Sequence, residues 1–183
     1  MGFVPLLVPN TKRIGGMEVI SFEVVEIDND FDIALLRATS KPRRRIMPFK
    51  LAFGLLPPGT EVAVTGYGSL ADFPLTMTAF VASQGSMHFG SGLLQAQQAQ
   101  LQFGRYSSIF VLDRPLPGGF SGSPVYVRDS GIVYGIAVEV RPDLNSGAPA
   151  MALAHPLKKA EEYLNKHHVQ YVSVPPVDDF VNP

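Results

Sequence analysis

The chain has 183 residues, of which 46% are hydrophobic and 17% charged, and its net charge at pH 7 is −1. This length and apolar content predict a folded protein with one large core or two small ones. The near-neutral charge argues against a nucleic-acid partner, and no stretch reaches the ~20 apolar residues that a transmembrane helix needs.

The chain contains no cysteine, so disulfides, a thiolate nucleophile and a cysteine-ligated metal are excluded. No pair of histidines or acids stands at metal-ligand spacing, and we expect neither a metal nor a cofactor. Residues 1–9 are apolar but lack a basic segment and contain two prolines, which is unlike a signal peptide. These features favour a cytoplasmic protein, or a bacterial one of any compartment.

The first part of the chain reads as two strands joined by a turn. Residues 19–27 are extended with one irregularity, residues 28–30 supply the turn, and residues 33–36 form a short apolar run typical of a buried strand. Asp32 stands directly before that run. It either points into a functional site or caps the turn.

The rest of the chain is also mostly strand. The spacing of the apolar segments suggests barrels, with strands at 61–66, 75–83, 108–113, 124–128, 132–140 and 149–154. Only residues 156–166 are convincingly helical, because proline begins the segment and leucines and alanine share one face.

Residues 118–124 (GGFSGSP) place one serine, Ser121, between glycines. An acyl-transfer serine needs an exposed hydroxyl and two backbone N–H groups that face the developing oxyanion, and those of Gly119 and Ser121 are the natural pair. Gly, Ser and Pro also cluster in ordinary turns, so the heptapeptide alone leaves both interpretations open.

The Asp32 strand and the Ser121 loop, in this order, resemble the signatures of the trypsin-like (chymotrypsin-fold) serine peptidases. Residues 62–68 and 131–138 also fall where that family would place them. The resemblance covers residues 17–166 and is nearest to the cysteine-free bacterial branch that includes the high-temperature-requirement proteases. It implies an all-β fold of two Greek-key β-barrels, with an incomplete first barrel and a C-terminal helix.

This resemblance implies a division of the chain into four parts. We expect a partial first barrel with Asp32 (1–72), a second barrel with Ser121 and the oxyanion hole (73–155), a helix (156–168) and an extended tail (169–183). The chain begins about where the family's Ala-His segment would end. An incomplete barrel exposes unpaired strand edges, so we expect another chain or a missing N-terminal segment to complete it.

No histidine precedes Asp32, although the general-base histidine of the resembled family does. Without a base Ser121 has no proton acceptor, and loss of this group in a related enzyme costs on the order of 10⁶-fold in turnover. His88 is a poor substitute and reads as an exposed loop residue. His167 and His168 read as a cap at the end of the last helix.

The resemblance places the substrate pocket between Pro115 with Leu116, residues 138–140 (Val138, Glu139 and Val140) and His155. No aspartate stands at the base of this pocket, which argues against a preference for Lys or Arg. His155 either pairs with an acidic substrate side chain or simply packs before Pro156.

Two functions remain open. The first is a trypsin-like serine endopeptidase that cleaves peptides or proteins, and that is inactive as this sequence stands because the general base is absent. The second is a pseudo-peptidase that binds a peptide along the edge strand at 138–140. Fold-level analogy does not decide between them.

Overall fold

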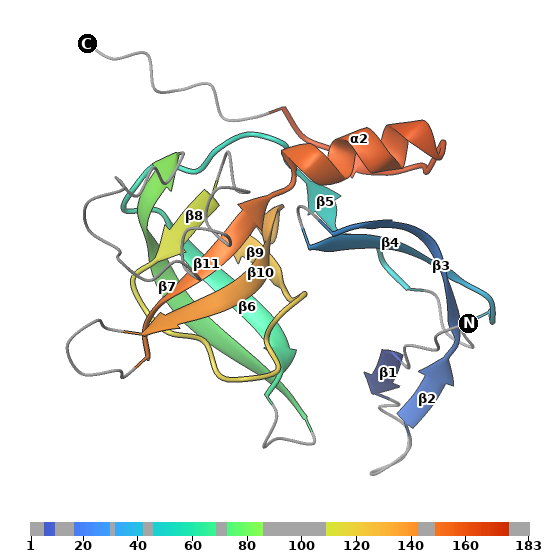
Figure 1. Ribbon diagram of the computed structural model, residues 1–183, viewed down its shortest axis with the longest axis horizontal. Coiled ribbons are helices and arrows are strands. Elements are labelled where there is room, and N and C mark those ends of the chain that lie inside the picture. The colour runs from blue at the N-terminus through green and yellow to red at the C-terminus, as the bar shows by residue number, and fades with distance from the viewer. Residues whose placement is uncertain are drawn as a thin grey trace. The chain divides into compact units, whose positions relative to one another are not determined.

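Strands dominate the structure, a computed structural model that describes residues 6–9, 17–29, 32–41, 46–68, 73–85, 109–142 and 149–175 (Figure 1). The chain divides into two compact units, Met1–Pro48 and Phe49–Pro183, each described by itself below. Among the described residues the single helix is α2 (Lys158–Lys166). The predicted all-β fold with a C-terminal helix is confirmed.

The first unit holds two separate antiparallel pairs of strands. Strand β1 (Leu6–Pro9) pairs with β2 (Met17–Ile20), and β3 (Phe22–Asp28) pairs with β4 (Ile33–Ala38). The predicted irregularity is present, because the register of β3 shifts between Val24 and Glu26. The described residues of this unit therefore form two-stranded sheets and no closed barrel.

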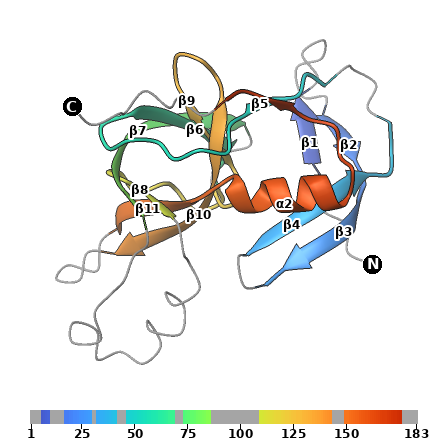
Figure 2. The ribbon, with the colours of Figure 1, turned by 90° about the horizontal axis from the view of Figure 1, so that it is seen from above.

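The second unit contains a closed six-stranded barrel (Figure 1 and Figure 2). Its strands follow one another in the order β6 (Glu61–Tyr67), β7 (Pro74–Gly85), β8 (Ile109–Leu112), β11 (Pro149–Pro156), β10 (Val133–Pro142) and β9 (Pro124–Val127). Antiparallel pairing of β9 with β6 closes the ring. Closure removes the exposed edges that an open sheet would present.

The barrel interior is filled by strand residues and by residues of the connecting loops. Val62, Val64, Phe110 and Leu112 are each fully buried, and Phe120, from the loop before β9, joins the same cluster at 1% exposure. Successive residues of a strand face opposite sides, which explains the alternating apolar pattern of β6. The core therefore fixes the end of the loop that carries Ser121.

The predicted boundary between residues 72 and 73 stays a prediction, and strands on either side of it pair with each other. Strand β6 pairs with β7 along its whole length, and three of its residues also pair with β9. The division between the two units falls after Pro48. The sequence interpretation took the segment near residues 69–75 for a linker between barrels, whereas it connects two paired strands of one barrel.

The predicted helix is confirmed, with slightly shorter bounds. The backbone N–H of His167 donates to Tyr163 O at 3.0 Å, and that of His168, whose φ is 53°, donates to Asn165 O at 3.1 Å. Both histidines therefore end the helix, as expected for a C-cap. This helix is too short and too polar to cross a membrane.

Part of the predicted extended tail pairs with the sheet of the second unit. Strand β12 (Val172–Ser173) pairs in parallel with β5 (Lys50–Leu51), which pairs in parallel with β10. The N–H of Val174 then donates to Leu51 O at 2.9 Å, and its side chain packs against the barrel core. Residues 176–183 of the predicted tail lie outside the described residues.

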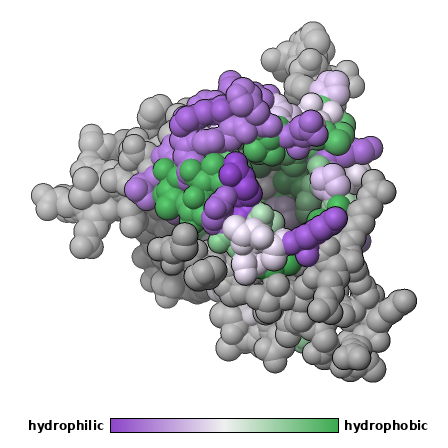
Figure 3. Space-filling view, turned by 90° about the vertical axis from the view of Figure 1, so that its right-hand side faces the viewer, coloured by the Kyte–Doolittle hydropathy of each residue, from purple (hydrophilic) through white to green (hydrophobic). Residues whose placement is uncertain are grey.

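Hydrophilic and hydrophobic side chains are mixed on the surface of the described residues. On the face shown in Figure 3, hydrophilic and hydrophobic residues are interspersed. Within the described ranges, no group of three or more histidine, aspartate or glutamate side chains gathers in a way that would hold a metal ion.

Candidate functional site

The loop between β8 and β9 makes two consecutive turns. In the first, Phe120 N–H donates to Pro117 O at 3.3 Å and Gly119 has a φ of 92°. In the second, Ser123 N–H donates to Phe120 O at 3.0 Å and Gly122 has a φ of 84°. A left-handed residue at the third turn position favours glycine, which explains both glycines on the same ground.

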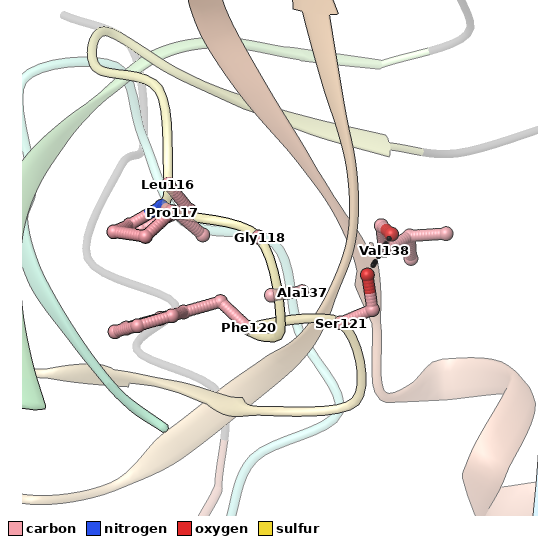
Figure 4. Close-up of a pocket in the computed structure, with 7 residues that line it drawn as sticks. All are labelled: Leu116, Pro117, Gly118, Phe120, Ser121, Ala137 and Val138. Carbon is pink, nitrogen blue, oxygen red and sulfur yellow. Dashed lines mark hydrogen bonds between the residues drawn. The ribbon is translucent and has the colours of Figure 1, made fainter. Parts of the chain in front are cut away.

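Ser121 is displayed at the corner of the second turn. Its side chain is exposed, whereas the adjacent Phe120 and Ser123 are only 1% and 7% exposed. Figure 4 shows Ser121 and Phe120 leaving the backbone in opposite directions, and the serine Oγ donates a hydrogen bond to Val138 O at 2.8 Å. The buried neighbours therefore anchor both ends of a turn whose hydroxyl faces solvent.

The backbone donors of this loop fall into two groups. The N–H groups of Phe120, Gly122 and Ser123 are committed to carbonyl oxygens, that of Gly122 to Ala137 O at 2.7 Å. Among the described residues, those of Gly119 and Ser121 donate to no backbone carbonyl. An oxyanion is stabilised by N–H groups that lie beside the serine hydroxyl and have no other acceptor, and these two N–H groups meet both conditions.

A pocket of about 250 Å³ lies beside the serine (Figure 4). Apart from the serine, its walls are apolar side chains and backbone, and it is lined by Leu116, Pro117, Gly118, Phe120, Ser121, Ala137 and Val138. A buried unpaired charge is costly in such a lining. The pocket is therefore chemically suited to an uncharged apolar group.

Three of the predicted site residues meet at this pocket, namely Leu116, Ser121 and Val138. Val138 stands at a bulge, because the pairing of β10 with β11 shifts register between Ala137 and Glu139. A bulge leaves one residue out of the ladder, so its carbonyl is available to the serine.

The other predicted pocket residues are placed differently. Pro115 and His155 are not among the described residues that line the pocket, and His155 is 2% exposed on β11, opposite Ile136 of β10. Nothing in this lining supports a pairing of His155 with an acidic substrate side chain. The side chains of Glu139 and Val140, and the whole of His88, lie outside the described residues.

Asp32 stands in the turn between β3 and β4. It is exposed, and its φ of 52° lies in the left-handed region, which aspartate adopts more readily than most residues. Asp32 belongs to the first unit and Ser121 to the second. Their cooperation in one site therefore stays a prediction.

Sequence reasoning missed four lining residues, which are Pro117, Gly118, Phe120 and Ala137. Three of them lie in the loop just before the serine, so the turn-forming residues of that loop were the sequence signal that could have identified them. The sequence patterns gave Phe120 no role in the site. A bulky apolar residue next to an exposed serine also indicates a buried anchor.

A family model described as "Trypsin-like peptidase domain" matches residues 9–136 of the chain. A search of curated protein sequences gave no significant match.

Solved structures of proteases share the fold at low sequence identity. The MamO protease domain from Magnetospirillum magneticum, in its apo form, has a TM-score of 0.62 and 18% identity, covering 88% of this chain and 75% of that one. The Rv3671c protease in its inactive form has a TM-score of 0.59 and 17% identity over 82% of this chain and 68% of that one. The HtrA-type protease AlgW with a decapeptide has a TM-score of 0.60 and 17% identity over 82% of this chain, but over only 41% of its own length.

Proposed function

The chain belongs to the trypsin-like peptidase domain family, and from that premise we propose that Ser121 is the nucleophile of a serine endopeptidase site. One observation carries the proposal. The exposed Ser121 hydroxyl stands beside two uncommitted backbone donors and an apolar pocket. Ordinary turn chemistry explains the glycines but not the coincidence of all three features.

Each part of the site has a role in acyl transfer. The Ser121 Oγ attacks the scissile carbonyl carbon while its proton passes to a general base. The carbonyl oxygen becomes an oxyanion that accepts hydrogen bonds from Gly119 N–H and Ser121 N–H. The C–N bond then breaks, the amine leaves with the proton from the base, and water hydrolyses the acyl-serine. Asp32 orients the base, as the acid of this family does.

The general base is the part that this sequence does not supply. All four histidines follow Asp32, and the Ser121 hydroxyl donates to the carbonyl oxygen of Val138, which is too weak a base to remove the proton. We therefore expect the 183-residue chain by itself to turn over no peptide.

That hydrogen bond favours a second candidate function, a pseudo-peptidase that binds peptides without cleaving them. The AlgW structure was solved with a decapeptide, and a peptide is also the ligand that we propose here. Pairing of β10 with β9 ends at Ile136, so at Val138 the backbone of β10, beside the exposed pocket, would hold such a peptide by adding it to the strand.

The apolar lining predicts the kind of side chain that the pocket accepts. We expect peptides with an aliphatic residue in the pocket to bind more tightly than matched peptides with Arg or Glu, because neither charge finds a partner among Leu116, Ala137 and Val138. Equal binding of all three peptides would contradict this assignment.

The edges of the β3–β4 pair, which pair with no other strand among the described residues, also suggest a protein partner. A two-stranded sheet is marginal by itself, so the β3–β4 pair is a candidate to accept a further strand from another chain. Monomeric behaviour of the chain at all concentrations in analytical ultracentrifugation would argue against this partner.

The function is tested by intact-mass labelling with a fluorophosphonate. The variants are Ser121→Ala and, as a matched exposed turn serine, Ser130→Ala. Labelling that Ser121→Ala abolishes and Ser130→Ala keeps would support the peptidase and show that a base is present after all. Unlabelled folded protein that binds an aliphatic hexapeptide would support the pseudo-peptidase. Folded protein that is not labelled and does not bind the hexapeptide would overturn both functions, because both require the pocket beside Ser121 to receive a peptide.

A further inference from the structure

The residues of β6 and its end that face the barrel interior change from large to small along the chain. Val62 and Val64 fill the barrel and are fully buried, but the next two residues on this face, Gly66 and Gly68, are glycines. Neither glycine has a left-handed φ among the described residues, so backbone conformation does not require them. The space around each glycine can therefore be compared where the chain meets the Ser121 loop.

Gly66 lies in direct contact with that loop. A Cβ at this position would collide with Ser123 Oγ, and would lie 3.2 Å from Ser123 Cβ and 3.4 Å from Phe120 Cδ1. Ser123 and Phe120 are both buried, so neither can swing out into solvent without cost. A side chain at position 66 would therefore push the loop away from the barrel.

Gly68 touches the same loop but leaves more room. A Cβ there would lie 3.5 Å from Leu75 Cδ1, 3.7 Å from Phe120 Cε2 and 3.9 Å from Pro117 Cβ, all ordinary van der Waals contacts. Alanine at position 66 would therefore collide with the loop, whereas alanine at position 68 would fit beside it.

The residues that Gly66 contacts are the two ends of the second turn. Phe120 O accepts the hydrogen bond from Ser123 N–H, and Ser121 lies between these residues. Moving either end must reorient the N–H of Ser121 and the adjoining peptide of Gly119. The space left by the absent side chain of Gly66 therefore determines how the backbone donors are aimed.

We propose that Gly66 is a positioning residue for the Ser121 site, because its missing side chain lets Ser123 and Phe120 seat against β6 and so fixes the direction of the Gly119 and Ser121 N–H groups. The catalytic meaning of this inference rests on the proposed function. The geometric claim does not, since it concerns where two amides point.

The test compares Gly66→Ala with the double variant Gly66→Ala/Ser123→Gly, and uses Gly68→Ala as the matched control. Backbone amide signals are followed by ¹H–¹⁵N correlation spectroscopy on the full chain. We expect Gly66→Ala to shift the Gly119 and Ser121 signals and to lower the urea midpoint. Ser123→Gly in the same chain removes the obstructing atoms and should return both signals toward their original positions. Gly68→Ala should leave both signals in place.

Each outcome decides the inference. Folded Gly66→Ala with unchanged Gly119 and Ser121 signals overturns it, and so does a double variant no closer to the original spectrum than Gly66→Ala. If Gly66→Ala does not fold, a folded double variant supports the inference and an unfolded one overturns it. Absence of labelling and of peptide binding in the unsubstituted chain would instead count against the proposed function, and the amide signals would still report on Gly66.

Discussion

The two units of the chain solve the same problem of strand pairing in different ways. The second unit closes six strands into a ring around a large cluster of buried side chains. The first unit, where it is described, pairs its strands two by two, and among its described residues Ile20 and Ile33 are the only buried apolar side chains. A closed ring has no free edges, whereas each two-stranded sheet has two.

The two predicted catalytic residues therefore stand on structural elements of different stability. Ser121 is carried by a loop whose Phe120 is anchored in the barrel core, while Asp32 stands in a turn of a two-stranded sheet. Two-stranded sheets are marginal in water without further packing. We therefore expect the serine loop to be rigid on its own and the aspartate to depend on additional contacts.

The largest expected effect is in amide hydrogen exchange. Core strands open only by global unfolding, whose free energy is about 5–15 kcal/mol, while weakly packed elements open locally at much lower cost. We expect the amides of β6 and β9 to exchange at the global limit, and those of β3 and β4 to be several kcal/mol less protected. Equal protection in both units would break the comparison.

Removal of a core side chain should come next in size. Phe110 is fully buried in the barrel, so Phe110→Ala should lower the free energy of unfolding by about 3–5 kcal/mol through lost burial and a cavity. Phe80→Ala is the matched control, because Phe80 is 43% exposed on the neighbouring strand β7. Urea unfolding measures both, and a smaller loss for Phe110→Ala than for Phe80→Ala would contradict the assigned core.

The segment after the helix should contribute a smaller amount. The Tyr171 ring meets the Phe53 ring edge-on at 5.3 Å between centroids, and its hydroxyl donates to Asn165 Oδ1 at 2.9 Å. Tyr171→Ala should cost about 1–2 kcal/mol and expose the Val174 amide to exchange. Tyr171→Phe keeps the ring contact and should retain most of that protection. If the alanine variant protects Val174 as well as the original chain does, β12 does not need this tyrosine.

The smallest effect concerns alkaline pH. Burial raises the pKa of Tyr134 above its ordinary value of 10.0. The unfolded chain therefore ionises this phenol first, so the stability that is fully present below pH 10 falls as pH rises from there through the folded-state pKa. Tyr134→Phe should lose less stability than the original chain between pH 9 and pH 11 in urea titrations. Parallel pH profiles would show that the buried phenol does not contribute.

The sequence carried much of the fold because strand signals here are local. Short apolar segments identified β6, β7 and β10, and the proline and apolar face at 156–166 identified α2. The boundary between the units could not be predicted from local sequence patterns. It depends on β6 pairing with both β7 and β9, and the latter is about sixty residues away in sequence.

The candidate site divides in the same way. The glycines at 119 and 122 predicted the turns around Ser121, because their positive φ values follow from residue type. The pocket followed only in part, because the resemblance predicted Leu116 and Val138 but not Ala137, and the burial of His155 depends on the whole barrel. Whether Asp32 joins Ser121 is a question of tertiary arrangement that motifs do not answer.

The left-handed glycine of the second turn has a consequence for chemical synthesis. Gly122 has a φ of 84°, and nothing lies within 4 Å of the place where an L side chain would project. The obstacle to alanine at this position is therefore handedness rather than space. A D-amino acid prefers this region of backbone conformation. A semisynthetic chain with D-alanine at position 122 would match the handedness of the turn and restrict the unfolded ensemble, which substitution by a natural L residue would not do.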